Sequence, residues 1–95
     1  MLGAWLLFSC FIDSMIIQDV SITKYMGRLY LHTKPADGDA STRIISRSEW
    51  DSRILILSDR ENLRAVLYKK NDQWHFKFKD ADGWSSSGDA SCNEL

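Results

Sequence analysis

The segment 73–79 alternates strictly between aromatic and polar side chains. The aromatic residues occupy every second position, at Trp74, Phe76 and Phe78. Because successive side chains of a strand point to opposite faces of the sheet, this period of two predicts a half-buried strand. Its inner face is aromatic, and its outer face carries His75 and Lys77. The chain is therefore expected to bury one side of this segment in a β-sheet core.

The same period recurs along most of the chain, and turn-forming sequences such as Asn71-Asp72 separate the segments. Strands are expected near 16–24, 27–33, 53–58, 63–70 and 73–79, with a further strand near 4–12. A short helical turn is expected at 48–51, and loop or tail at 34–42 and 85–95. The sequence thus predicts an all-β fold, a small antiparallel meander of five to six strands forming a sandwich or an open barrel. The expected core consists of Leu29, Leu31, Ile54, Ile56, Leu63, Leu67, Trp74, Phe76 and Phe78.

One domain over residues 1–95 accounts for the whole chain, because 95 residues with 44% apolar and 26% charged side chains are typical of one folded unit. All twelve Lys and Arg residues lie within 23–79, between two acidic ends. The basic middle is either a face for a polyanion or, as we favour, is neutralised by the acidic ends, including the acidic tail at 85–95. Residues 20–38 also align with residues 65–83, either as a duplicated β unit or, the preferred interpretation, as two similar hairpins.

The N-terminal segment 1–14 begins with an apolar run that is long enough for the core of an export signal but lacks a basic start. We favour an N-terminal strand over a cleaved signal. Cys10 and Cys92 are the two cysteines, and they form either a disulfide or two unrelated thiols. The compartment stays open, with the cytoplasm slightly favoured over secretion or the endoplasmic reticulum lumen.

No catalytic signature is present, so we expect no enzyme and no cofactor. His32 and His75 are expected on outer faces of strands, and no Cys or His spacing matches a metal site. The acidic pairs at 37–39 and 80–82 are explained by turns rather than by a bound ion.

The segment 69–79 interleaves aromatic and cationic residues, as proteins that bind single-stranded nucleic acid do. Strict alternation places the rings and the cations of this segment on opposite faces, so nucleic acid is not the expected partner. A protein partner is expected instead. A membrane surface and self-association through an edge strand are weaker alternatives.

Three short motifs resemble the opening strands of pleckstrin-homology domains. They are Gly27-Arg-Leu29-Tyr30, Trp50-Asp-Ser-Arg53-Ile-Leu-Ile-Leu57, and Leu63 followed by Leu67-Tyr68-Lys69. The resemblance implies an adaptor-like sheet that binds protein or lipid head groups through the loop at 34–49, with Arg43, Arg47 and Arg53 as contacts. No capping helix follows these strands.

A non-enzymatic binding or interaction module is the expected function, because loops on a rigid sheet are the evident feature of the chain with which it could contact a partner. Trp50 and Trp84 lie in polar segments and are the candidate contact residues, although a role as caps on the open ends of the core is slightly preferred. The alternatives are a small secreted or lumenal structural protein with an N-terminal export signal, and a pleckstrin-homology-like adaptor fragment.

Overall fold

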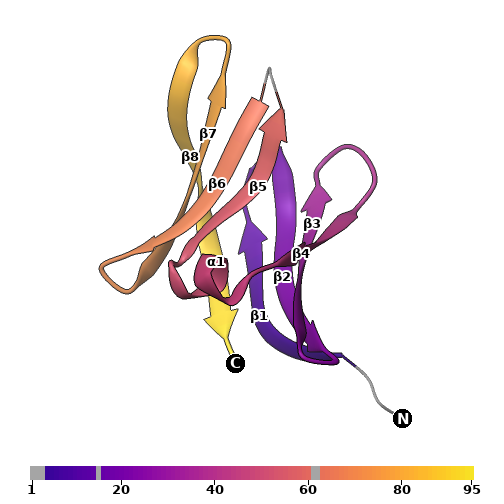
Figure 1. Cartoon of the computed structure of the whole chain (residues 1–95). Helices are drawn as coiled ribbons and strands as arrows, with labels where there is room; N and C mark the ends of the chain where they lie inside the picture. The colour runs from indigo at the N-terminus through magenta and orange to yellow at the C-terminus, as the bar shows by residue number, and fades with distance from the viewer. Residues whose placement is uncertain (1–3, 15, 61–62) are drawn as a thin grey trace.

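Eight strands and one short helix form the described part of the chain, which in this computed structural model comprises residues 4–14, 16–60 and 63–95. The strands are β1 (Trp5–Ile12), β2 (Ile17–Tyr25), β3 (Arg28–Pro35), β4 (Ser41–Ile45), β5 (Ile54–Arg60), β6 (Leu63–Lys70), β7 (Gln73–Asp80) and β8 (Gly83–Glu94); the helix is α1 (Arg47–Asp51). All neighbouring strands pair antiparallel, in the order β4-β3-β2-β1-β8-β7-β6-β5 (Figure 1). The predicted all-β meander is confirmed, with eight strands rather than five or six.

The long strand β8 belongs to two sheets. Its second half pairs with β1, and its first half pairs with β7, where Trp84 lies opposite Lys79. The first sheet therefore contains five strands and the second four, with β8 common to both. The sequence of β8 is rich in Ser and Gly, which pack little side chain against a neighbour and tolerate a bend. The inner faces of both sheets contribute to one apolar core and form an open barrel.

The predicted loop at 34–42 is correct for residues 36–40 and wrong at its ends, where β3 reaches Pro35 and β4 begins at Ser41, and the predicted acidic tail at 85–95 is wrong because β8 extends to Glu94. Neither β4 nor β8 carries the apolar alternation that identified the others. In β4, four of the five residues are exposed, and Ile45 is the buried exception. The described side chains of β8 contribute only the partly buried Ala90 and Cys92 to the core. These strands are held by backbone pairing rather than by a hydrophobic face.

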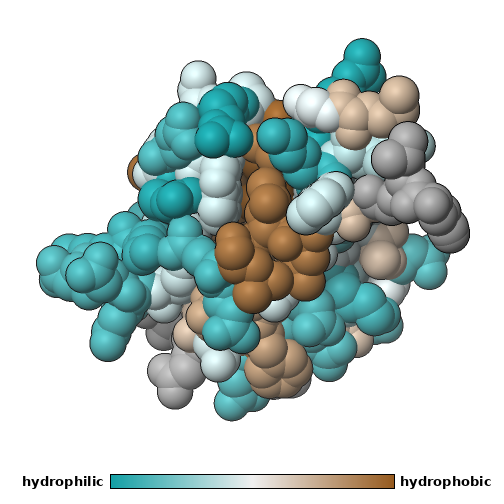
Figure 2. All heavy atoms as spheres, turned by 90° about the horizontal axis from the view of Figure 1, so that it is seen from below, coloured by the Kyte–Doolittle hydropathy of each residue, from teal (hydrophilic) through white to brown (hydrophobic). Residues whose placement is uncertain are grey.

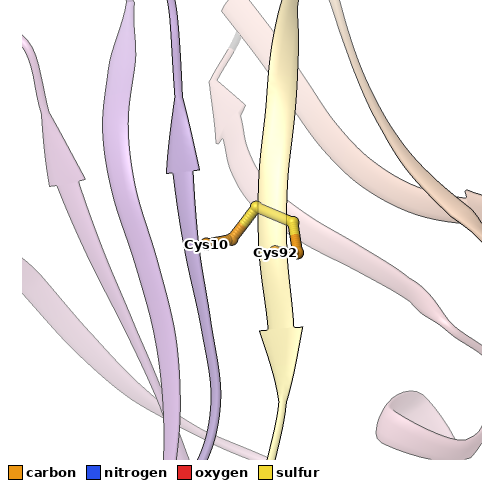
Figure 3. The surroundings of a disulfide bond; sticks show 2 residues. All are labelled: Cys10 and Cys92. Atoms are coloured by element: carbon orange, nitrogen blue, oxygen red, sulfur yellow. A yellow bond between two sulfur atoms is a disulfide. The ribbon is translucent and has the colours of Figure 1, made fainter.

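The N-terminal segment supplies an interior strand. β1 lies between β2 and β8, and the side chains of Phe8 and Ile12 are fully buried. Residues 1–3 of the predicted signal-like segment 1–14 lie outside the described residues. Cys10 lies directly opposite Cys92 in the β1–β8 ladder, and a disulfide joins them (Figure 3).

The expected core is correct for five residues that are buried: Leu29, Leu31, Leu67, Trp74 and Phe76. Leu63 and Phe78 are partly buried. The assignment is wrong for Ile54 and Ile56, which are 51% and 46% exposed, whereas Leu55 is fully buried. The phase of β5 is set by the turn out of α1, where Arg53 has a φ of 57°. The apolar run that follows contains no polar residue, so its pattern could not show which positions face inward.

Two hairpins of the barrel have the same layout, which gives the aligned segments 20–38 and 65–83 equivalent places in the two sheets. Strands β2 and β3 are joined by Met26-Gly27, and β6 and β7 are joined by Asn71-Asp72. All four turn residues have positive φ, with values of 50°, 77°, 53° and 63°. This conformation matches the right-handed twist of a tight hairpin, and it explains why Gly and Asn occur there.

The barrel is open between β4 and β5, which are the two ends of the strand order. The connection between them contains α1, whose N-terminus is capped by the Ser46 hydroxyl, which accepts a hydrogen bond from the Glu49 N–H (3.0 Å). Helix α1 packs beside β5. None of the helical structure among the described residues has the length and apolar character needed to cross a membrane.

Candidate binding face on β6 to β8

The outer face of the second sheet presents aromatic rings from three strands. Tyr68 of β6 lies directly opposite His75 of β7, and their rings stack with centroids 5.4 Å apart and an interplanar angle of 28°. Trp84 of β8 lies opposite Lys79 on the same face and is 51% exposed. Cross-strand neighbours of this kind stabilise a sheet and also hold each ring in a fixed orientation.

Lys77 occupies the centre of this group. Its Nζ atom lies 5.1 Å from the centroid of the Tyr68 ring and 4.8 Å from the centroid of the Trp84 ring. A cation over an exposed ring contributes about 0.5–1 kcal/mol. We call the set Tyr68, His75, Lys77, Lys79 and Trp84 the ring–cation face.

Further cations extend the ring–cation face along β6. Arg64 lies opposite Lys79, and Lys70 lies at the other end of the strand, beside the hairpin. Arg64 forms an ion pair with Asp59 of β5 (3.0 Å). Among the described side chains, no carboxylate forms an ion pair with Lys70, Lys77 or Lys79.

The expectation that rings and cations are separated holds within β7 but not across the sheet. Trp74 and Phe76 are buried, and His75 and Lys77 face outward, as the alternation predicted. The rings that accompany the cations come from the neighbouring strands. Counting outward from the two-residue turn at 71–72 places Tyr68 opposite His75. The pairing of these two rings could therefore be predicted from the expected hairpin. The place of Trp84 could not, because β8 was expected to be a tail.

Trp50 is buried, with 7% of its surface exposed, so its predicted role as a surface contact is wrong. Its ring lies 5.4 Å from Phe8 and 6.3 Å from Trp74, between centroids, and is nearly parallel to Trp74. The three rings close the end of the core next to α1. The alternative role considered for Trp50, a cap on the open end of the core, is the one its position fits.

Arg53 covers this aromatic cluster from outside. Its guanidinium lies 4.1 Å from the Trp50 ring centroid, and it pairs with Glu94 (3.2 Å), which also accepts a hydrogen bond from Lys69. The hydrogen bond from Lys69 is the main cause of a lowered pKa of Glu94, and the charges of Arg53 and Lys69 lower this pKa further. The indole N–H of Trp74 also lowers it, although this buried Nε1 lies outside hydrogen-bond geometry.

Arg43 and Arg47 have separate roles. Arg43 pairs with Glu49 and donates a hydrogen bond to the main-chain oxygen of Ile56, whereas Arg47 forms a loose pair with Asp51 (3.6 Å). Residues 34–49 are not one loop, since they include β4 and the start of α1. The structure brings Arg47 and Arg53 into the lining of one cleft at the α1 end, but Arg43 is not part of that lining, so the three do not form the single contact surface that the pleckstrin-homology resemblance implies.

Two clefts lie at opposite ends of the barrel. The cleft between the ends of β3 and β5 has a volume of about 400 Å³ and a mixed lining that includes Ile17, Thr33, Asp39 and Leu57. The cleft at the α1 end has about 450 Å³ and is lined by Leu7, Lys24, Arg47, Trp50, Arg53, Glu94 and Leu95. Seen from this end, apolar surface gathers in the centre and hydrophilic residues surround it (Figure 2).

Among the described side chains, neither histidine belongs to a recognisable catalytic group. The ring of His32 lies between the hydroxyls of Thr23 (2.8 Å) and Thr42 (3.0 Å), and His75 stacks on Tyr68. Within the parts of the chain that the structure describes, no three His, Cys, Asp or Glu residues are grouped so as to hold a metal ion.

Comparison of the chain with protein-family models, with curated protein sequences and with solved structures finds no match.

Proposed function

We propose that this chain is a non-enzymatic binding module that contacts its partner through the ring–cation face. The observation that carries the proposal is Lys77, which is held between the partly buried ring of Tyr68 and the exposed ring of Trp84. The Trp84 indole is 51% exposed, so about half of its surface is available to a partner. Rings of this kind, fixed on a rigid sheet, supply large contact area at a low cost in conformational entropy.

The charge of the face adds a requirement on the partner. Lys77 and Lys79 project outward without a carboxylate partner among the described side chains, so a partner with negative charge fits best. An acidic protein and a nucleic acid both carry such charge, and the capture experiment below distinguishes them because it quantifies both. Apolar side chains of β5 border the face at Ile54 and Ile56, and these enlarge the contact area available.

The test compares two exposed tryptophans. Tagged parent, Trp84→Ala and Trp5→Ala chains are expressed in the source cells, crosslinked and purified, and the bound proteins and nucleic acids are quantified. Trp5 is 75% exposed on β1, so it is a matched control outside the face. We expect the partner to be lost from Trp84→Ala and kept by Trp5→Ala. A partner that all three chains retain equally would contradict the proposal.

A secreted or lumenal protein is the second candidate, and the Cys10–Cys92 disulfide is the observation that favours it. Disulfides persist in oxidising compartments, so this bond argues against the cytoplasm. Alkylation of the protein from its own source without reductant should leave its intact mass unchanged if both cysteines are paired. An added mass of two alkyl groups would show two free thiols and would favour the cytoplasm as the compartment.

A further inference from the structure

We infer that the partner of the ring–cation face is a single-stranded nucleic acid. The inference rests on the proposed function, because it names the ligand class of the same face. It replaces the expectation from sequence that nucleic acid is not the partner. That expectation assumed that rings and cations lie on opposite faces, which holds for β7 alone.

Two neighbouring rings of this face, the half-exposed Trp84 and the partly buried Tyr68, are the candidates for stacking on bases. Tyr68 and Trp84 both lie within about 5 Å of one Lys77 Nζ atom, so the two rings are near neighbours on one face. Proteins that bind single strands without sequence preference stack successive bases on aromatic side chains, because every base has a π-face. A duplex hides its bases between its own strands, so these rings suit a single strand better than a double strand.

The cations follow the length of the same strands. Arg64 and Lys70 mark the two ends of the row on β6, and Lys77 and Lys79 lie beside it on β7. At about 3.3 Å per residue, the distance from Arg64 to Lys70 is about 20 Å, which is enough for a few nucleotides of backbone. Asp59 pairs with Arg64, so about three of these four cations are expected to contact phosphate.

The experiment is a titration of the full chain with a fluorescently labelled 12-nucleotide oligothymidine, followed by anisotropy. With about three phosphate contacts, affinity should fall roughly 15- to 20-fold between about 50 and about 200 mM salt. A duplex of the same length should bind more weakly than the single strand. A heparin fragment, which carries negative charge but no bases, serves as the second probe.

Matched variants locate the site. Trp84→Ala should weaken oligothymidine binding by about 5- to 160-fold, the usual effect of removing one stacked ring. Lys77→Gln should weaken it and reduce the salt dependence by roughly one contact. Trp5→Ala and Lys24→Gln remove a ring and a cation from cross-strand neighbours on the first sheet, and they should change nothing. Thermal melts check that all four variants fold.

Each outcome has one meaning. Binding that follows this pattern supports a single-strand platform. Absence of oligothymidine binding overturns the ligand class. Heparin binding that is as tight as oligothymidine binding, and that Trp84→Ala does not weaken, also overturns it. The proposed function is then tested separately by the capture experiment. Equal losses in Trp84→Ala and Trp5→Ala would show that the oligonucleotide does not use the ring–cation face.

Discussion

Arg43 of β4 donates a hydrogen bond of 2.7 Å to the main-chain oxygen of Ile56 on β5. These two strands are the ends of the sheet order, so the bond joins edges that have no ladder between them in the described structure. The same guanidinium donates two hydrogen bonds to the carboxylate of Glu49 in α1, at 2.6 and 3.2 Å. One side chain therefore connects β4, α1 and β5 where the barrel is open.

Replacing Arg43 with Ala should lower the free energy of unfolding by about 1–2 kcal/mol, because charge-assisted hydrogen bonds to a carboxylate and a carbonyl are lost at a partly exposed site. Arg47→Ala is the matched control, since its pair with Asp51 is long and exposed and should be worth less than about 0.5 kcal/mol. Urea denaturation measures both. Equal midpoints for the two variants would show that Arg43 does not hold the open side of the barrel.

The Cys10–Cys92 disulfide joins the paired strands β1 and β8, over a sequence separation of 82 residues. A crosslink over a loop of this length restricts the unfolded chain strongly. The Cys10→Ala, Cys92→Ala double variant should therefore be less stable by about 2–4 kcal/mol. Denaturation of the parent with and without reductant gives an independent measure. Reductant should destabilise the parent and leave the double variant unchanged, and any other pattern would contradict this role.

Adjacent residues of β5 test the facing of the strand. Leu55 is fully buried and Ile56 is 46% exposed, so Leu55→Ala should cost about 2–5 kcal/mol and Ile56→Ala less than about 1 kcal/mol. Thermal or urea unfolding of the two variants distinguishes them. The opposite order would restore the facing expected from the sequence, in which Ile54 and Ile56 point inward.

The sequence predicted those strands in which one face of apolar side chains packs into the core. Strand β7 was readable because its aromatic residues alternate with polar ones, and the hairpin before it was readable from Asn71-Asp72. Strand β4 and most of β8 were not readable, since edge exposure and small residues remove the period of two. Which side chains of β5 point into the core depends on the backbone conformation of Arg53. The local sequence pattern does not indicate that conformation.

The candidate site shows the same limit. The outward direction of His75 and Lys77 followed from alternation, but a site made from three strands requires the register between them. Trp84 joined the face only because β8 pairs with β7 and not because of anything in its own segment. Trp50 illustrates the converse, since a Trp in a polar segment was buried by packing against Phe8 and Trp74.

The last prediction concerns acid stability and the carboxylate of Glu94. The hydrogen bond from Lys69, followed by the charges of Arg53 and Lys69, lowers its pKa below the ordinary value of 4.5. A carboxylate with a lowered pKa in the folded state stabilises the protein above the ordinary pKa. This contribution is lost as the pH falls through the lower pKa of the folded state.

Glu94→Gln keeps the size of the side chain and removes its charge, so the variant should be less stable than the parent at pH 7. The two stabilities should converge as the pH is lowered from about 5 toward about 3, because the parent carboxylate then becomes neutral as well. Urea midpoints of both proteins at a series of pH values measure the difference. Asp82→Asn is a suitable control, since Asp82 lies exposed in the β7–β8 turn and has no ion pair among the described side chains. A Glu94 difference that stays constant from pH 7 to pH 3 would mean that the Lys69 and Arg53 contacts do not stabilise the charged form.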